Sequence, residues 1–225
     1  ISISDDFQEN FKGPLPFDKL RLSASKIDTY NRCQLKYKYS NIDLIPQTRY
    51  NSVFALGNVV HKVLQDFHEN KFNSFDDASK LLAEHWNSNL YFYKCESEQY
   101  YSDASDMLKK YCDYLEDNPA SPVLFEAFFE INMNDYVLSG IIDRVDVDSS
   151  GNIKIYDYKT SASQNTENKL KKSFQLPIYA LAVYSGSESL DVKIKSGQSS
   201  IMASELSLRF DDMERTIELK EVDIE

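Results

Sequence analysis

The sequence predicts an α/β domain in which several helices precede a small sheet, and three observations point to that class. Apolar residues recur at helical spacing through the first half of the chain. From position 123 onward, runs rich in β-branched and aromatic residues alternate with turn signals. One further helical segment separates these runs from two final strand patterns. The 225 residues, 42% of them hydrophobic, suffice for one well-packed core.

The N-terminal half is expected to be an arm followed by helices. Residues 1–20 are polar and contain Gly13, Pro14 and Pro16, which is typical of an arm or linker. The segment Leu22-Ser23-Ala24-Ser25 offers an N-cap candidate for a first helix that reaches about Tyr39. Further amphipathic helices are expected over residues 55–72, 76–91 and 99–117.

The C-terminal half is expected to form the sheet. Turn signals separate three strand runs, which should form an antiparallel meander over residues 123–133, 136–147 and 152–160. A helix kinked near Pro177 is expected over 168–184, and two last strands over 201–210 and 215–222. We therefore expect one domain over residues 21–225, with a helical part to about residue 120 and a core over about 121–225.

The net charge of −11 hides a segregation along the chain. Residues 19–75 carry +5 and residues 149–202 carry +3, whereas residues 76–148 carry −11. Local charge decides what a groove attracts, so the acidic total does not exclude nucleic acid. The first basic stretch could follow a phosphate backbone and stack bases on tyrosine through Lys26, Tyr30, Arg32 and Lys36. A solvated helix face is the alternative.

Cysteine usage and the absence of targeting signals indicate a cytoplasmic protein. Cys33, Cys95 and Cys112 are odd in number and widely spaced, which favours a reducing, intracellular compartment. We expect Cys95 and Cys112 to be buried small apolar residues. The sequence contains no run of about 20 apolar residues for a membrane span and no signal peptide. Residue 1 is Ile, so we expect a piece of a longer protein.

Two carboxylates are expected to face each other across the second predicted hairpin. Residues i and i+2 of a strand share a face, so Asp157 and Lys159 should project side by side, about 7 Å apart. A turn centred on Ser150 places Asp143 opposite Asp157, with about 5 Å between Cβ atoms. Acid–lysine pairs are common on solvated faces, but both acids here interrupt apolar runs, and buried charges need partners. A cation between the carboxylates would relieve their repulsion, and oxygen ligands favour Mg²⁺ or Mn²⁺.

The first predicted hairpin extends this acidic row. With Asn134-Asp135 as a two-residue turn, Glu126 faces Asp143. Glu126, Asp143 and Asp157 would then cross three adjacent strands in one row, with Lys159 beside it. A register slip of one residue would break the row.

At this point the motifs resemble those of RecB-like nucleases, which belong to the PD-(D/E)XK superfamily. Residues 140–146 (GIIDRVD), 155–160 (IYDYKT) and 175–180 (QLPIYA) are similar to the GxIDRxD, hxDYKT and QLxxYA motifs of that family. Residues 22–27 with 30–33 resemble the family's opening motif, and residues 56–61 (LGNVVH) resemble its GxxxH helix. The five motifs occur in the family's order over about residues 20–185. The resemblance extends to nuclease domains attached to UvrD/Rep-type helicases and to AddB-like and RecB-like helicase–nuclease subunits.

The resemblance implies a restriction-endonuclease-like core and a Mg²⁺- or Mn²⁺-dependent deoxyribonuclease, acting as an exonuclease or endonuclease. Its implied metal ligands are His61, Asp143, Asp157 and the backbone carbonyl of Tyr158. Lys159 would position or activate the attacking water and stabilise charge on the phosphate. Glu126 matches an acidic position upstream of the GxIDR motif.

The resemblance also implies partners and supporting residues. Gln175 and Tyr179, one helical turn apart, would line the DNA path or support the site. The substrate would be single-stranded or unwound DNA, and the parent protein would carry a helicase domain acting in DNA repair or recombination at the nucleoid. No phosphate-binding GxxxxGK loop is present, so this chain is not itself expected to be a nucleotide-driven motor.

Three further residues of types that can bind metals, one cysteine and two histidines, are not expected to bind one. Some relatives hold a 4Fe–4S cluster through a cysteine at the position of Cys33 and three C-terminal cysteines. This chain has no cysteine after Cys112, and Gln34 replaces the usual proline, so we expect no iron–sulfur cluster. His68 and His85 lack the close spacing of a two-histidine zinc site and are expected to be packing or surface residues.

Two alternatives to a deoxyribonuclease remain open from the sequence. A catalytically inactive domain of the same fold could serve only to bind DNA or act as a scaffold. A free-standing ribonuclease is the other, because no feature of the sequence distinguishes the two nucleic acids.

Overall fold

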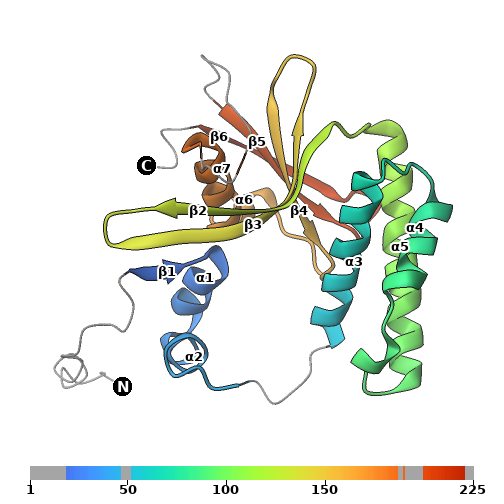
Figure 1. The fold of residues 1–225 in the computed structure, drawn as a ribbon, viewed down its shortest axis with the longest axis horizontal. Coiled ribbons are helices and arrows are strands. Elements are labelled where there is room, and N and C mark those ends of the chain that lie inside the picture. The colour runs from blue at the N-terminus through green and yellow to red at the C-terminus, as the bar shows by residue number, and fades with distance from the viewer. Residues whose placement is uncertain (1–18, 47–51, 187–189, 191–199, 221–225) are drawn as a thin grey trace.

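The computed structural model describes residues 19–46, 52–186, 190 and 200–220 of the chain. Figure 1 shows the course of the chain. The strands are β1 (Leu20–Leu22), β2 (Pro122–Asn132), β3 (Tyr136–Val147), β4 (Ile153–Lys159), β5 (Ser200–Ser207) and β6 (Glu214–Lys220). The α-helices are α1 (Ala24–Arg32), α2 (Gln34–Tyr37), α3 (Ser52–Glu69), α4 (Phe75–His85), α5 (Lys94–Asp117), α6 (Glu167–Leu170) and α7 (Gln175–Tyr184). A π-helical turn η2 (Lys38–Ile42) and a 3₁₀ turn η3 (Ser88–Leu90) complete the helical segments.

The described strands form one mixed sheet. Its order is β1-β3-β4-β5-β6, and β2 pairs with β3. β2, β3 and β4 make the predicted antiparallel meander in the predicted registers, with Asn132 opposite Val137 and Val147 opposite Ile153. β5 joins β4 in parallel and β6 joins β5 in antiparallel fashion, while β1 pairs in parallel with the start of β3. These pairings confirm an α/β architecture.

Helices cover both faces of the sheet and build two cores. On one face, α7 packs its nearly all-apolar surface against the strands, with Leu176 and Ala180 buried beside Ile142 and Ile155. On the other face, α3, α4 and α5 pack against one another and against β4 and β5, where Tyr156 belongs to the same core. Figure 1 shows α3, α4 and α5 gathered on one side and α6 and α7 on the other. No helix among the described residues combines the length and apolar character that a membrane crossing requires.

The first helix is shorter than predicted. Ser23 is its N-cap, as expected, and its hydroxyl oxygen accepts from the Lys26 backbone N–H at 3.4 Å. The helix predicted to reach Tyr39 ends at Arg32, because Cys33 is extended (φ −162°, ψ 103°). Cys33 then caps α2, with its Sγ accepting from the Lys36 N–H at 3.4 Å.

Other boundaries also differ from the sequence prediction. Leu20 already belongs to β1, and the rest of the predicted arm, apart from Lys19, lies outside the described residues. A strand of three residues is too short to show an alternating pattern, so sequence reasoning missed it. The break in the predicted 168–184 helix falls between Leu170 and Gln175, and Pro177 lies in the first turn of α7. There its missing N–H would have had no helical partner anyway.

Gly140 allows β2 and β3 to pack tightly beside α7. A Cβ atom at this position would lie 2.8 Å from Cζ and 2.9 Å from Cε1 of the buried Phe129 ring, and 3.7 Å from Cε1 of Tyr179. Distances below 3 Å require the ring or the backbone to move, and a packed interior offers little room.

Gly140→Ala is therefore expected to destabilise the protein by about 1–3 kcal/mol through overpacking. Chemical denaturation by guanidinium, followed by far-UV circular dichroism, measures the change in the free energy of unfolding. Gly57→Ala is the matched control, because a Cβ there would meet only Thr160 Oγ1 at 3.5 Å, an ordinary contact. A loss as large for Gly57→Ala as for Gly140→Ala would contradict this account.

Candidate metal centre and active site

The candidate site lies where β3 and β4 separate. The β3–β4 ladder ends at Arg144 opposite Tyr156. Beyond that pair, the Tyr158 backbone N–H donates to Asp143 Oδ2 at 2.6 Å. Asp143 is 8% exposed and Asp157, which follows the last pair on β4, is 2% exposed. We call the point where β3 and β4 separate the fork. At the fork, the Tyr158 N–H bonds to the Asp143 carboxylate instead of continuing the backbone ladder.

Three side chains from α3, β2 and β3 converge at this fork. His61 Nδ1 lies 3.2 Å from Glu126 Oε1 and 3.6 Å from Asp143 Oδ1. Among the described residues, His61, Glu126 and Asp143 form the one group of three potential metal ligands, with their ligand atoms all within 4.8 Å of one another. The flanking pairs Ala127–Ile142 and Phe125–Arg144 place Glu126 opposite Asp143, as the hairpin register predicted.

Glu126 has an unusual backbone conformation for a strand residue. Its φ of 41° lies in the left-handed region, which a residue with a Cβ adopts only at a cost of about 1–3 kcal/mol. The flanking ladder pairs hold this conformation in place, and the carboxylate meets His61. Sequence reasoning could not find this strain, because Glu carries no preference for the left-handed region.

Asp157 belongs to a second, adjoining cluster rather than to this group of three. Its Oδ2 lies 2.6 Å from the Lys159 Nζ, and its Oδ1 accepts from Gln175 Nε2 at 2.7 Å. Gln175 closes the ring, because its Oε1 accepts from Lys159 Nζ at 2.9 Å. Gln175 Nε2 also donates to the Tyr179 hydroxyl at 2.8 Å. Gln175 therefore contacts the acid and the lysine directly, and Tyr179 holds the Gln175 amide.

The charges of the site shift several pKa values. Burial, reinforced by the negative charge of Asp157, raises the pKa of Asp143 to about 7. Burial alone would lower the pKa of His61, but the hydrogen bond to Glu126 and the charge of Asp143 raise it to about 9. Burial likewise opposes charge on Lys159, and the contact with Asp157 outweighs it, so the pKa of Lys159 is raised. Lys159 and His61 are therefore cations at neutral pH in the metal-free protein.

The donor set of the first cluster fits a divalent ion. It offers one imidazole nitrogen and two carboxylates, of which Asp143 is buried and His61 and Glu126 are partly exposed. Carboxylate oxygen suits Mg²⁺ and Mn²⁺, while an imidazole nitrogen is better tolerated by Mn²⁺ than by Mg²⁺. A cation here would also relieve the repulsion that raises the pKa of Asp143.

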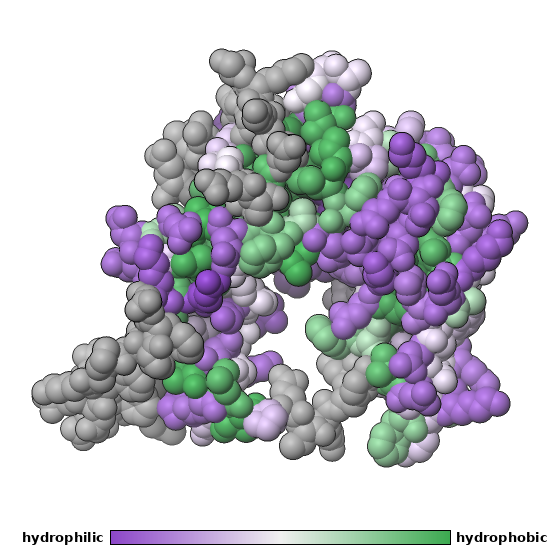
Figure 2. Space-filling view, in the orientation of Figure 1, coloured by the Kyte–Doolittle hydropathy of each residue, from purple (hydrophilic) through white to green (hydrophobic). Residues whose placement is uncertain are grey.

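Two grooves lie beside the clusters. The α1-side groove is lined by the N-terminal end of α1 with its N-cap (Ser23, Ser25, Asp28), together with Asp143, Gln175 and Tyr179. The α3-side groove, of about 560 Å³, is lined by Val53, Phe54, Gly57, Asn58, His61, Lys62, Gln65, Glu126 and Thr160. Figure 2 shows the surface hollowed between the α1–α2 segment and α3. An extended polymer could thus pass the site rather than end in a closed pocket.

The predicted basic side chains lie on the α1–α2 segment, apart from both clusters. Lys26 Nζ donates to the Arg21 carbonyl at 3.0 Å, and Arg32 pairs with Asp28 at 2.7 Å. The ring of exposed Tyr30 meets Tyr37 edge-on at 5.4 Å between centroids, and Lys36 is exposed. Of this segment, only the first turn of α1 lines a groove that reaches Asp143.

A buried polar network lies behind the site. The Arg144 side chain, 1% exposed, donates to the Tyr111 hydroxyl, forms an ion pair with Asp146 at 2.8 Å and stacks over the Tyr156 ring at 3.8 Å. The Tyr111 hydroxyl lies 3.0 Å from the Tyr158 hydroxyl. The network therefore fixes the side chain of the same residue whose backbone N–H holds Asp143. Sequence reasoning did not identify it, because its members come from α5, β3 and β4.

The remaining histidines and cysteines have the following places. His68 is buried against Tyr111 at 2.6 Å, and burial with the nearby Arg144 charge lowers its pKa to about 3, so it packs as a neutral residue. His85 pairs with Asp66 at 2.6 Å. Cys112 is half-buried, but Cys95 is exposed, so the prediction that Cys95 is buried was wrong; its position in the first turn of α5 points outward.

Tyr111→Phe is expected to destabilise the protein by about 1–3 kcal/mol, because it removes the hydroxyl that bonds to the buried His68 imidazole and to Nη1 of the buried Arg144. Arg144 keeps its ion pair with Asp146. Urea denaturation of the metal-free protein measures the loss. Tyr100→Phe on the same helix is the control, since its ring contact with Tyr91, at 5.6 Å, survives the change. Equal stability of Tyr111→Phe and wild type would show that the network adds nothing.

Comparison with known proteins agrees with this geometry. The sequence profile of the PD-(D/E)XK nuclease superfamily matches residues 21–222. One subunit of the ATP-dependent helicase/deoxyribonuclease of Streptococcus pyogenes, from serotype M49 strain NZ131 and from serotype M1, is 30% identical over 159 residues in each case. That alignment covers 64% of this chain and 14% of the relative, so the chain spans a small part of the length of these relatives.

A solved structure shares the fold. The crystal structure of a protein assigned as an exonuclease, from Eubacterium rectale, aligns with a TM-score of 0.50 at 10% identity, over 92% of this chain and 74% of that one. This likeness concerns the fold and confirms the predicted restriction-endonuclease-like class. Since the profile matches residues 21–222, nearly the whole chain, the chain belongs to the PD-(D/E)XK nuclease superfamily.

Proposed function

We propose that this chain is a metal-dependent nuclease that hydrolyses phosphodiester bonds in DNA. The observation that carries the proposal is the convergence of His61, Glu126 and Asp143 beside the Asp157–Lys159 pair. Burial and the negative charge of Asp157 raise the pKa of the Asp143 carboxyl to about 7. A carboxyl whose pKa is strongly perturbed and that lies in a groove is a candidate for a functional site. Asp143 lines the α1-side groove, and its neighbours His61 and Glu126 line the α3-side groove, so both grooves give access to the same group of side chains.

The metal would be held by His61, Glu126 and Asp143, with Asp157 and the Tyr158 carbonyl as further proposed ligands. When bound, a divalent ion lowers the pKa of a water molecule and polarises the scissile phosphate. Mn²⁺ and Mg²⁺ are the candidates, and the imidazole favours Mn²⁺. Tyr158 contributes in a second way, since its N–H orients the Asp143 carboxylate.

Lys159 would act as a fixed cation and hydrogen-bond donor. Its raised pKa keeps the ammonium group charged, so it donates to the attacking water or to a phosphate oxygen and does not take up a proton. Asp157 and Gln175 hold its Nζ at 2.6 and 2.9 Å, which limits its motion before substrate arrives. Tyr179 in turn fixes the Gln175 amide.

The wider setting follows from the relatives. They are named as helicase/deoxyribonuclease subunits, so we propose that this chain is the nuclease module of such a helicase–nuclease, working inside the cell in DNA repair or recombination. The DNA would arrive unwound, and Lys26, Tyr30, Arg32 and Lys36 of the α1–α2 segment would contact its backbone and bases on one side of the site.

Lys159→Ala is expected to lower the rate of DNA cleavage in Mn²⁺ by about 10²–10³-fold, because it removes the fixed cation that faces the developing charge. The measurement is single-turnover cleavage of single-stranded and duplex DNA with Mn²⁺ or Mg²⁺, each against EDTA. Lys154→Ala is the matched control: it also lies partly buried on β4, but pairs with Glu214 at 2.6 Å. Equal cleavage rates of Lys159→Ala and wild type would contradict the proposed catalytic role of Lys159.

The same assay separates the rival explanation. A scaffolding domain would bind DNA but cleave nothing above the EDTA background in the wild type. It would also bind no Mn²⁺ through carboxylates. Parallel assays on RNA of the same sequence test the ribonuclease alternative.

Mn²⁺ binding is expected to strengthen as pH rises. In the metal-free protein, His61 with a pKa of about 9 and Asp143 with a pKa of about 7 hold protons that the ion must displace. The dissociation constant should therefore fall about tenfold per pH unit between pH 7 and 8.5, where His61 alone is protonated, and more steeply below pH 7. Isothermal titration calorimetry in buffers of different ionisation enthalpy measures both the affinity and the protons released.

Two histidine variants sharpen this test. His61→Asn should weaken Mn²⁺ binding and flatten the pH dependence above pH 7. His85→Asn changes a histidine that is paired with Asp66 instead of the cluster, and should leave the wild-type slope. A dissociation constant independent of pH in the wild type would contradict the assigned ligands.

A further inference from the structure

Three exposed aromatic side chains lie near the start of α3, and one of them, Phe54, lines the α3-side groove. Phe92 is 83% exposed, Phe54 is 69% exposed and Tyr93 is 64% exposed. We call these three residues the aromatic platform. Single exposed aromatic residues need no explanation, but three near the start of a helix that lines a groove with candidate metal ligands do.

One carboxylate connects the two segments that carry the aromatic platform. Glu96 accepts from the Phe92 backbone N–H at 3.0 Å, and its carboxylate also bonds to the side chain of Ser52, the first residue of α3. The first turn of α3, which carries Phe54, therefore lies beside the Phe92–Tyr93 segment. The Phe92 and Tyr93 rings contact each other edge-on, with centroids 4.8 Å apart.

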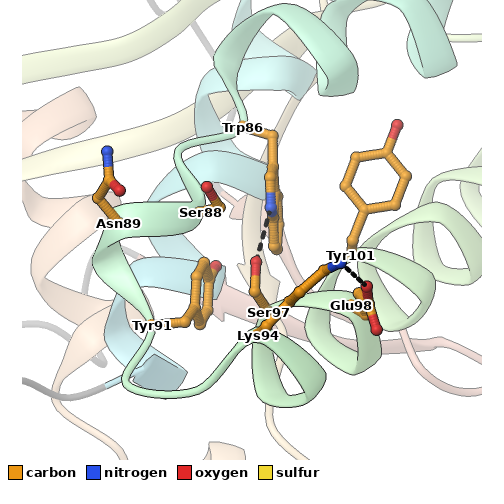
Figure 3. A pocket seen from close by; sticks show the side chains of 8 residues that line it. All are labelled: Trp86, Ser88, Asn89, Tyr91, Lys94, Ser97, Glu98 and Tyr101. Carbon is orange, nitrogen blue, oxygen red and sulfur yellow. Dashed lines mark hydrogen bonds and ion pairs between the residues drawn. The ribbon is translucent and has the colours of Figure 1, made fainter.

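The segment that carries Phe92 and Tyr93 is anchored from behind. Tyr91 is 9% exposed and stacks on Trp86, with centroids 4.9 Å apart and planes at 9°. Figure 3 shows these stacked rings beside Tyr101, and the Trp86 Nε1–H donating to Ser97 Oγ at 3.2 Å. A preorganised surface loses less conformational entropy when a ligand binds, so this anchoring favours the two neighbouring rings as a binding surface.

The face of α3 connects the aromatic platform to the candidate active site. Phe54, Asn58 and His61 lie at helical spacing and line one groove, which ends at Glu126. The buried side chains of α3, such as Leu56 and Val60, serve the core on other faces of the helix, so the core does not need Phe54. Seven residues of helix separate Phe54 from His61, about 10 Å, which is the length of about three stacked nucleotides.

We propose that the aromatic platform stacks the bases of a single-stranded segment of the substrate, about three nucleotides from the phosphate at the metal centre. The proposal rests on the proposed function and adds a base-binding site to it. Continuity with the groove favours nucleic acid as the occupant over a partner protein. Stacking on aromatic rings tolerates any base, because every base has a π-face, and it requires bases that are not paired within a duplex.

The test measures binding separately from cleavage. Fluorescence anisotropy with labelled single-stranded DNA of 12 nucleotides in EDTA gives the affinity of the full chain. The triple variant Phe54→Leu/Phe92→Leu/Tyr93→Leu keeps apolar volume and removes the π-faces, and we expect it to weaken binding by at least about tenfold, since one stacked base accounts for at least about fivefold. Phe72→Leu, beyond the opposite end of α3, is the control and should bind like wild type.

A length series and abasic sites locate the contact. Oligonucleotides that extend fewer than three nucleotides past the cleavage position should not distinguish the triple variant from wild type. Abasic sites three to five nucleotides from that position should weaken wild-type binding and leave the triple variant unchanged, because the lost contact is the same one. Thermal unfolding confirms that the variant is folded, as its three side chains are exposed.

The outcomes separate the two proposals. Unchanged DNA affinity of the folded triple variant, while the wild type cleaves DNA, would overturn the aromatic platform and leave the proposed nuclease intact. Unchanged DNA affinity together with a changed oligomeric state would indicate a protein-docking surface instead. Loss of binding in the triple variant when the wild type cleaves no DNA would support the platform and contradict the nuclease.

Discussion

The arrangement of the site is set by the need to offset the repulsion among three carboxylates that adjacent strands bring together. Glu126, Asp143 and Asp157 come from β2, β3 and β4, and two of them are almost fully buried. Burial disfavours the charged form of Asp143, and the negative charge of Asp157 adds to this effect, so the pKa of Asp143 rises to about 7. The cations and hydrogen-bond donors around these carboxylates offset their repulsion.

The groups that offset this repulsion come from helices on both faces of the sheet. The N-terminal helical part therefore contributes to the site. His61 reaches the fork from α3, and Gln175 reaches it from α7 on the other face of the sheet. The Tyr158 N–H and the Lys159 ammonium group are contributed by β4 itself. The packing of α3 and of α7 against the sheet thus sets the geometry of the charges, and a shift of either layer would leave a buried carboxylate without its partner.

Local patterning predicted the strands and the acidic row, because a hairpin register follows from its turn and from alternation. Asn132 opposite Val137 and Val147 opposite Ile153 bear this out. The end of the first helix at Cys33 and the left-handed backbone of Glu126 were not predictable from local sequence patterns. The hydrogen bonds of Asp157 to Gln175 and of Arg144 to Tyr111 join distant segments, which periodicity alone cannot pair.

The sequence Asp143–Arg144 shows how one strand serves both the site and the fold. Successive residues point to opposite sides of β3, so Asp143 faces the fork while Arg144 and Asp146 pair behind it with Tyr111 and Tyr158. A slip of one residue would place the guanidinium among the candidate metal ligands and leave a carboxylate among the buried tyrosine hydroxyls. The second exchange buries a carboxylate without a cation beside it, so the polar network adds to the apolar packing in specifying the register. The polar network thereby favours the register that assembles the acidic row, and the fold maintains a repulsion that by itself would destabilise it.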